Sequence, residues 1–357
     1  MKTSTAPIDN AKLDAFIGQV VTDMGATLSS ALVVIGDRLG LYRAMAEAGP
    51  ITSEELAQRT GTSERYIREW LINQAAGGYV AYDATAQRYY LPPEQAFALA
   101  DATSPFAVGA LQIVTAMVKA ESRIMENFRT GEGMLWGEHD PRLFEGTERF
   151  FRPGYNANLV SNWIPALEGV HEKLVRGASV ADVGCGHGAS CIILAQAYPN
   201  SHIYGFDNHE PSIARARQMA EQAGVADRVT FEVASAQNYP APLSGYDLIA
   251  YFDCLHDMGD PTGACRHAYE SLAPDGTVLI VEPMAGDHPE ENFNPVGRVY
   301  AGASTLCCTP NALASGGHAL GTVATEEALR DVVTAGGFTR FRRATETPVN
   351  RIFEARR

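Results

Sequence analysis

Positive charge is scarce in this chain. Its 357 residues include 28 Lys and Arg against 42 Asp and Glu, which gives a formal net charge of −14. A surface of that average sign repels both a phosphate backbone and anionic lipid headgroups. The composition therefore argues against nucleic acid and membranes as partners.

Long apolar runs and paired cysteine motifs are also missing. We find no run of about 18 apolar residues that could span a bilayer, and the first ten residues lack the apolar core of a signal peptide. The six cysteines form no CxxC pair, so reduced thiols are expected rather than disulfides. The vicinal pair Cys307-Cys308 could bind a soft metal or sense oxidants, but burial as plain thiols is the expectation. Together these absences predict a cytoplasmic protein.

The chain does have apolar residues, 46% of the total, and these can bury a large core. Its length predicts more than one domain. We expect a winged-helix or dimerisation domain over residues 1–115, a helical connector over 116–175 that lines a pocket, and a cofactor-binding domain over 176–357.

The first segment predicts helix, turn, helix and a two-stranded wing. Helical spacing over 25–41 stops at Gly40. A capping signature at Thr52 or Ser53 opens the next helix, and a further helix over 64–76 leads to strands at 79–82 and 89–91. This order is typical of a winged-helix domain.

Such a domain could bind DNA, but its second helix lacks a basic face. Arg65 and Arg68 are balanced by Glu64 and Glu69 beside a wide apolar stripe that includes Trp70. Packing or homodimerisation is therefore the expected role, because an apolar helix face must be covered.

After Gly177 the pattern alternates strands with helices, which predicts a parallel sheet covered on both faces. Two final strands joined by a short connection must pair antiparallel to each other. The expected strands cover 179–183, 202–206, 229–233, 246–252, 277–281, 339–345 and 351–356. The expected helices cover 188–198, 211–223, 261–272 and 325–335. The fold class is α/β, a Rossmann-like seven-stranded sheet, parallel with a C-terminal antiparallel strand, preceded by a mostly helical winged-helix domain.

The most informative motif is Ala181-Asp-Val-Gly-Cys-Gly-His-Gly-Ala-Ser190, where a buried strand turns into a helix. Its glycines allow positive φ and a close approach to a ligand, and the helix directs free N–H groups at it. The spacing fits the dinucleotide fingerprint, with Asp207 about 20 residues on, so an NAD-dependent oxidoreductase is one interpretation. Asp182 before the first glycine, the preceding helical domain and the closing antiparallel pair favour S-adenosylmethionine instead. That ligand needs a carboxylate near its ammonium group and an acid for its ribose.

On these features the sequence resembles the class I S-adenosylmethionine-dependent methyltransferases. More narrowly it resembles the mycobacterial and actinobacterial group with an N-terminal winged helix, and its architecture is similar to that of small-molecule O-methyltransferases. The resemblance rests on the glycine motif, Gly205-Phe-Asp207, the segment Tyr246–Pro261 that contains Leu-His-Asp, and Val281-Glu-Pro283.

The resemblance implies a set of site residues. Asp207 would bind the ribose hydroxyls, and Ser235 stands where relatives often have an acid near the adenine. Arg152 could reach the methionyl carboxylate, and Tyr155 would shape the cavity. The implied cofactor-binding residues are Asp182, Gly184, Cys185, Gly186, Asp207, Asn208, Ser235, Ala236, Phe252, Asp253, Arg152 and Tyr155.

His256 is the candidate catalytic base, and Glu282 matches a position that orients it. A near-neutral imidazole can take a proton from an attacking hydroxyl, and a carboxylate fixes its tautomer. Helix capping or cofactor contact is the alternative role for His256. The segment 316–322, where plant relatives carry a second acid, has none here.

A divalent metal is a third possibility, because Asp253, His256, Asp257 and Asp260 are dense enough to hold one. Asp260-Pro261 is also a good helix cap, so no metal site is predicted. The aromatic connector and the segment 292–300 would wall the acceptor pocket.

The predicted function is transfer of a methyl group from S-adenosylmethionine to a hydroxyl of a small, apolar or aromatic molecule. A thiol or a nitrogen is the less favoured acceptor. The alternative from another class is a winged-helix regulator that senses S-adenosylmethionine.

Overall fold

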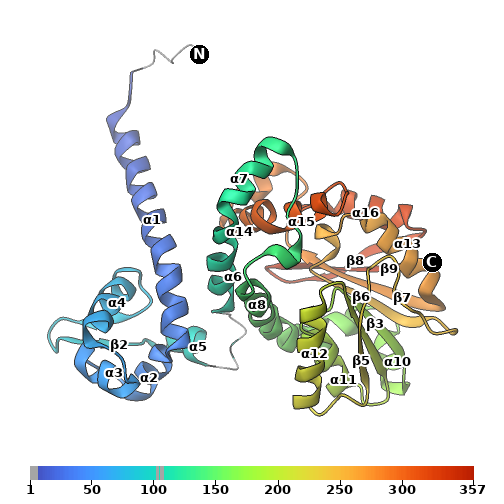
Figure 1. Cartoon of the computed structure of the whole chain (residues 1–357), viewed down its shortest axis with the longest axis horizontal. Coiled ribbons are helices and arrows are strands. Elements are labelled where there is room, and N and C mark those ends of the chain that lie inside the picture. The colour runs from blue at the N-terminus through green and yellow to red at the C-terminus, as the bar shows by residue number, and fades with distance from the viewer. Residues whose placement is uncertain (1–6, 102–103, 105–107) are drawn as a thin grey trace. The chain divides into compact units, whose positions relative to one another are not determined.

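The computed structural model describes residues 7–101, 104 and 108–357 (Figure 1). It divides into two compact units, Met1–Thr115 and Ala116–Arg357. Each unit has its own apolar core.

The first unit has the predicted helix-turn-helix and wing. Thr52 caps the third helix in a complete capping box with Glu55, because its hydroxyl accepts a backbone N–H that the first turn cannot satisfy internally. Ile51 bridges to Tyr89 and so adds a third short segment to the wing. The elements are α1 (Asn10–Arg38), α2 (Leu41–Ala48), α3 (Ser53–Thr60), α4 (Glu64–Ala76), β1 (Ala81–Asp83), β2 (Arg88–Tyr90) and α5 (Pro93–Ala100).

Helix α1 differs from the sequence expectation in two ways. It begins at Asn10, capped by the side chain of Asp9, rather than near Gly25. The expectation that no stretch is long and apolar enough to cross a membrane is also wrong, because α1 meets that criterion, with 17% of its most apolar window buried. A buried core helix and a signal sequence meet the same criterion, so length and composition alone do not assign α1 to a membrane.

The second unit is built on a seven-stranded sheet with the order β5-β4-β3-β6-β7-β9-β8. Strand β9 runs antiparallel to both of its neighbours, β7 and β8, and the other neighbouring strands of this sheet pair in parallel. The predicted fold class is therefore confirmed. The strands are β3 (Ser179–Val183), β4 (His202–Asp207), β5 (Val229–Val233), β6 (Tyr246–Phe252), β7 (Leu272–Pro283), β8 (Arg340–Glu346) and β9 (Asn350–Arg356).

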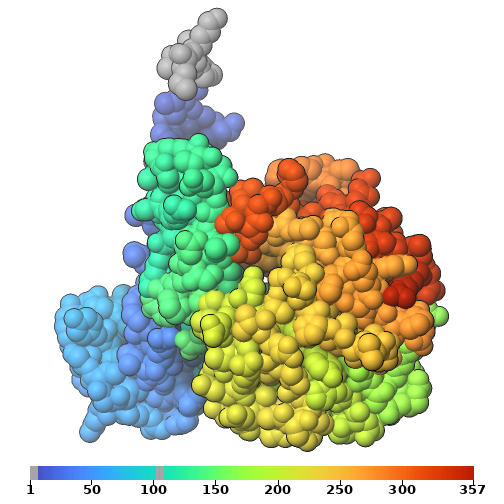
Figure 2. All heavy atoms as spheres, turned by 45° about the vertical axis from the view of Figure 1, so that its right-hand side comes forward, coloured from blue at the N-terminus to red at the C-terminus, as the bar shows by residue number. Residues whose placement is uncertain are grey.

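Alternate strand residues enter two apolar layers, one on each face of the sheet. Val180 and Leu248 pack with helices α10 (Val170–Arg176), α11 (Ala189–Ala197) and α12 (Glu210–Gln222). Their neighbours Ala181 and Ile249 pack with α13 (Pro261–Ser271) and α16 (Glu326–Ala335). Burial on both faces is what near-continuous apolar strands require. In the space-filling view this part of the chain, yellow-green to red, forms one continuous rounded surface (Figure 2).

The connector and the segment 295–314 contain more helix than the sequence indicated. Residues 150–156 lie in the interior of α8, which continues through Pro153. A proline is usually found in the first turn of a helix, but Pro153 lies inside α8, which passes directly into the π-helical segment η3. Residues 131–141 include a short 3₁₀ turn, and helix covers most of 295–314, where none was predicted. The elements are α6 (Gly109–Met117), η1 (Val118–Ala120), α7 (Glu121–Thr130), η2 (Trp136–Glu138), α8 (Arg142–Asn158), η3 (Leu159–Trp163), α9 (Ile164–Ala166), η4 (Leu255–Asp257), η5 (Pro289–Asn292), α14 (Pro295–Ala303), η6 (Ser304–Cys308) and α15 (Thr309–Ala314).

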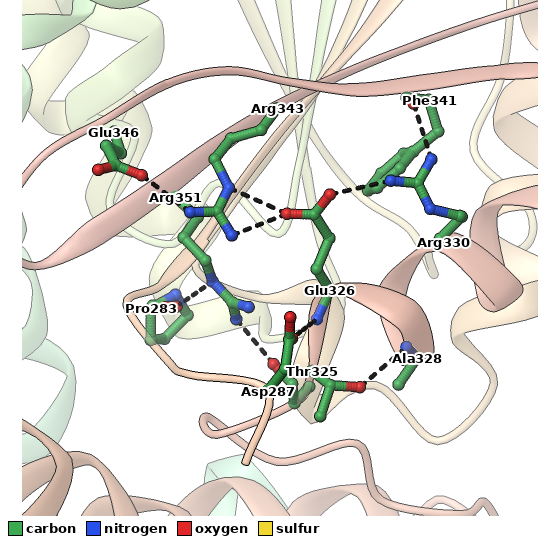
Figure 3. Close-up of polar contacts among 11 residues, drawn as sticks. Pro283, Asp287, Thr325, Glu326, Ala328, Arg330, Phe341, Arg343, Glu346 and Arg351 are labelled. Carbon is green, nitrogen blue, oxygen red and sulfur yellow. Dashed lines mark hydrogen bonds and ion pairs between the residues drawn. The ribbon is translucent and has the colours of Figure 1, made fainter. Parts of the chain in front are cut away.

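A polar network ties the closing strands to the end of β7 (Figure 3). Glu326 at the start of α16 accepts from Arg343 of β8 and from Arg330. The buried Arg351 of β9 donates to the carbonyl oxygens of Pro283, at 2.9 Å, and Ala324, at 2.8 Å. These charge-assisted bonds fix the position of the strand end that carries Glu282.

Candidate active site

A cavity of about 360 Å³ opens in the second unit at the carboxyl ends of β3, β4, β5 and β6. Its volume lies within the range of small-molecule pockets, about 300–1,000 Å³. Among the described residues that line it, five are acidic and none is Lys or Arg. This edge of an open α/β sheet is where ligands of such folds bind.

Most of the predicted cofactor-binding residues line this one cavity. Asp182 lies buried behind the glycine loop, and Arg152 is outside the wall. The predicted residues in the wall are Gly184, Cys185, Gly186, Asp207, Asn208, Ser235, Ala236, Phe252, Asp253 and Tyr155.

The glycine loop follows β3 with positive φ at all three glycines, +82° at Gly184, +53° at Gly186 and +77° at Gly188. A Cβ on Gly184 would lie 2.8 Å from the Sγ of Cys254, whereas one on Gly186 would meet no atom within 4 Å. Gly184 is therefore required by close packing, and Gly186 leaves open space at the loop.

Asp207, at the end of β4, is held by two backbone donors. The amide of Gly186 donates to its Oδ2 at 2.9 Å, and the amide of His209 donates to its Oδ1 at 2.8 Å. Burial raises the pKa of Asp207 although these two bonds act to lower it. A carboxylate retains further lone pairs, so the fixed side chain can still accept hydrogen bonds from a ligand.

Two other carboxylates each leave one buried oxygen without a hydrogen-bond partner. Asp182 accepts from Ser190 and Cys191 at Oδ2 only, and burial raises its pKa to about 6. Asp253 accepts from Asn350 at Oδ1 over 2.7 Å, while its Oδ2 has no partner. Asp253 also has φ +51°, an uncommon backbone state for a residue other than glycine. Unsatisfied buried carboxylate oxygens fit a cationic or hydrogen-bond-donating ligand.

His256 lies on the 3₁₀ turn that follows β6, next to the cavity-lining Asp257. Its Nδ1 is 2.7 Å from Oε2 of Glu282, and its backbone N–H donates to Oε1 of the same carboxylate. The two side chains are 4% and 1% exposed. Burial opposes the charged imidazole, but the Glu282 carboxylate raises the pKa of His256 well above its ordinary value. Neither side chain lines the cavity itself.

Arg152 forms an ion pair with Glu148 at 2.5 Å. The other oxygen of Glu148 lies 3.1 Å from Nδ1 of His187, the residue between two glycines of the loop. Glu148 and His187 both line the cavity. The sequence did not single out this pair, because α8 and the glycine loop are far apart along the chain and no local pattern links them.

The aromatic connector contributes part of the wall. Trp136, Phe144 and Phe151 line the cavity together with Tyr155, whereas no residue of the segment 292–300 does. Phe128, another aromatic residue of the connector, does not line the cavity and is 75% exposed. Asn311 of α15 and Ser315, which caps that helix, also line the cavity, and no sequence pattern indicated either residue.

The residues considered as metal ligands separate in the structure. Asp260 accepts from the amide of Gly263 and caps α13, and Asp253 pairs with Asn350. His256 and Asp257 instead lie beside Cys308. All six cysteines are free thiols, and Cys254 alone is only half-buried.

Two protein families match the chain. Residues 174–327 match the methyltransferase domain, and residues 27–101 match the Rv2258c-like winged HTH domain. The S-adenosylmethionine-type domain and the winged helix expected from the sequence are therefore both confirmed at the level of family.

Curated relatives match about half of the chain or less. A 27-O-demethylrifamycin SV methyltransferase from Amycolatopsis mediterranei is 31% identical over 48% of this chain and 59% of its own length. A probable chloroplastic tocopherol O-methyltransferase from Oryza sativa is 27% identical over 41% of each chain.

Solved structures of similar fold cover nearly the whole chain. A putative O-methyltransferase from Nostoc punctiforme has a TM-score of 0.73 at 19% identity, covering 98% of this chain and 99% of its own. Human N-acetylserotonin methyltransferase, solved in complex with SAM, has a TM-score of 0.71 at 17% identity and covers 99% of each. At these identities the likeness shows the fold.

Proposed function

We propose that this chain, which carries a methyltransferase domain behind an Rv2258c-like winged helix-turn-helix domain, binds S-adenosylmethionine and methylates a hydroxyl group of a small molecule. His256 acts as the general base and Glu282 orients it. The observation that carries the proposal is the buried 2.7 Å contact between these two residues beside the cavity.

The cavity residues fit S-adenosylmethionine by their chemistry. That molecule carries an ammonium and a sulfonium group, and the unpartnered oxygen of the wall residue Asp253 suits donors and positive charge, with the charge of Asp182 behind the glycine loop. Asp207 is fixed where it can accept hydrogen bonds from a ribose diol. The bound cofactor supplies an electrophilic methyl carbon.

The His256–Glu282 pair fits proton removal from the acceptor. With Nδ1 engaged by the carboxylate, Nε2 is the nitrogen that takes the proton of the acceptor hydroxyl. The same carboxylate stabilises the imidazolium formed by that transfer, because opposite charges in a buried site interact strongly. A small and apolar or aromatic acceptor is consistent with the aromatic wall at Trp136, Phe144 and Phe151.

The proposal is tested first by binding and then by turnover. Calorimetry should detect S-adenosylmethionine binding to the purified protein, and Asp207→Ala should abolish it. A screen with methyl-deuterated cofactor and mass spectrometry should then identify an acceptor. His256→Ala should lower the rate on the order of 10²-fold or more, while the exposed His288→Ala should leave it unchanged. A loss of tenfold or less at His256 would leave it with a structural role only.

The regulator alternative predicts DNA binding by the first unit. On α4, Arg65 pairs with Glu69 and Arg68 pairs with Glu64, so these cations are already neutralised by neighbours. Salt-dependent binding of duplex DNA at physiological ionic strength would favour the regulator over the enzyme.

A homodimer through the N-terminal unit remains part of the proposal. Helix α1 leaves Phe16, Val21 and Met24 each 61% exposed, and apolar surface of this kind is commonly covered by a partner. Sedimentation velocity should give twice the mass of 38.4 kDa.

A further inference from the structure

Three side chains of different chemistry meet at the cavity wall, which Asp257 lines and behind which His256 and Cys308 lie. His256, Asp257 and Cys308 each offer one ligand atom, and all three atoms lie within 4.8 Å of one another. His256 and Asp257 come from the turn after β6, whereas Cys308 comes from the end of η6. One imidazole nitrogen, one thiolate and one carboxylate form a donor set that zinc accepts.

The orientation of His256 is the one found in metal sites. Its Nδ1 is held by the Glu282 carboxylate at 2.7 Å, which leaves Nε2 for a ligand. Metal-binding histidines almost always give their second nitrogen to a carboxylate or carbonyl, which fixes the ring and raises its basicity. Glu282 therefore serves a metal site as well as it serves a base.

Hydrogen bonds hold the two segments of the cluster together. Asn311 of α15, the helix that follows η6, donates from Nδ2 to the carbonyl of Asp257 at 2.9 Å. The amide of Gly321 donates to the carbonyl of His256 at 3.1 Å. Zinc bonds of about 2.3 Å to sulfur and about 2.0 Å to nitrogen put tetrahedral ligand atoms roughly 3.5 Å apart. The distances between the three ligand atoms, now up to 4.8 Å, would have to shorten by about an ångström through rotation of the side chains to match that geometry.

We propose that His256 Nε2, Cys308 Sγ and the Asp257 carboxylate bind one Zn²⁺ ion, with a fourth coordination position left for water. Binding forms a Zn–S bond as the S–H bond of Cys308 breaks and a Zn–N bond in place of any N–H bond at Nε2 of His256, and the displaced protons pass to solvent. Three protein ligands with one open position are the arrangement of catalytic zinc sites, whereas structural sites have four protein ligands.

The consequence of zinc binding rests on the proposed function. Nε2 of His256 has one lone pair, so it cannot hold a zinc ion and take a proton from an acceptor at the same time. Zinc and protons therefore compete for the atom on which methyl transfer depends, and the zinc-loaded protein lacks its base.

Zinc binding is tested without an acceptor. The full chain, free of affinity tag and stripped with a chelator under reducing conditions, is titrated with Zn²⁺ against a chromophoric competitor. We expect one tightly bound ion per chain, and Co²⁺ in its place should show a thiolate-to-cobalt charge-transfer band. Cys308→Ser should weaken binding by more than 100-fold. Glu282→Gln should weaken it by roughly 10–100-fold, the usual effect of losing such a supporting carboxylate.

Cys307→Ser is the matched control, because it removes the neighbouring buried thiol, which is not one of the clustered ligand atoms. It should retain binding within a few-fold. Binding below one ion per chain, or equal affinity in the Cys308 and Cys307 variants, would overturn the proposal. If Cys308→Ser does not fold, the absence of the charge-transfer band in the unaltered protein overturns it instead. Calorimetry with S-adenosylmethionine on the zinc-free protein tests the proposed cofactor binding separately, since neither His256 nor Cys308 lines the cavity.

Discussion

Asp182→Asn should make the stability of the second unit less dependent on pH. Asp182 is fully buried, one of its oxygens has no partner, and burial raises its pKa to about 6. An unfolded chain ionises the same group near pH 4. Over the interval between these values the folded state holds a proton that the unfolded state has lost, so wild-type stability falls as the pH rises.

The size of this effect follows from the two pKa values. A difference of about 2 in pKa corresponds to about 3 kcal/mol, which is the cost of keeping Asp182 ionised in the folded protein above pH 6. The amide side chain of the variant has no charge to bury, so its own cost is independent of pH. The stability of the Asp182→Asn variant relative to wild type should therefore increase by about 2–3 kcal/mol between pH 4 and pH 8.

Urea unfolding followed by tryptophan fluorescence measures this change. The transition of the second unit is the relevant one, and Trp163, only 2% exposed, reports on its core. Asp227→Asn is the matched control, because Asp227 is 70% exposed and its charge stays in water. The reasoning is refuted if the difference between Asp182→Asn and wild type is the same at both pH values. The variant should also bind S-adenosylmethionine more weakly, since the charge of Asp182 lies directly behind the glycine loop and attracts a cationic ligand through it.

Two further predictions concern the site. Because Glu282 raises the pKa of His256, the neutral base should appear only at high pH, so kcat/KM should rise with pH. The Glu282→Gln variant should have a lower plateau of kcat/KM, and the rising limb of its pH–rate profile should lie at lower pH. A rising limb at the same pH as in wild type would contradict this. Gly184→Ala should reduce both the melting temperature and the cofactor affinity. Its Cβ would lie 2.8 Å from the Sγ of Cys254 at φ +82°, and a left-handed backbone costs about 1–2 kcal/mol in a residue with a side chain. Scanning calorimetry and titration measure the two effects, with Gly18→Ala, whose Cβ would meet nothing within 4 Å, as the control.

Much of the sheet could be predicted because each strand is a short apolar run between turn signals. β3 and β6 have the expected bounds to the residue. β7 is longer than the predicted 277–281, since Leu272 pairs with Tyr246 beyond a register shift. Its Pro274-Asp-Gly276 segment has the composition of a turn, and it falls at that register shift, between the pairs Tyr246–Leu272 and Leu248–Thr277.

The cofactor side of the cavity was predictable for a related reason. Residues that directly follow parallel strands must meet at one edge of the sheet, which brings Gly184, Asp207 and Asp253 together. The approach of Cys308 to His256 was not predictable, because it depends on how the helical segment 295–314 packs. No periodicity of either segment encodes that contact.

The acidic lining of the cavity is better explained by its ligand than by its fold. Burial raises the pKa of the lining residues Asp207 and Asp253, and of Asp182 behind the glycine loop, so each carboxylate opposes folding when it is ionised. No Lys or Arg among the described wall residues offsets these charges. A protein shaped only for stability would place amides or apolar groups there. A positively charged ligand in the cavity would lower all three pKa values and release protons, so binding should strengthen as the pH rises through about 6. An anionic ligand would give the opposite dependence and a neutral one little dependence, and calorimetry in buffers of different ionisation enthalpy distinguishes these cases.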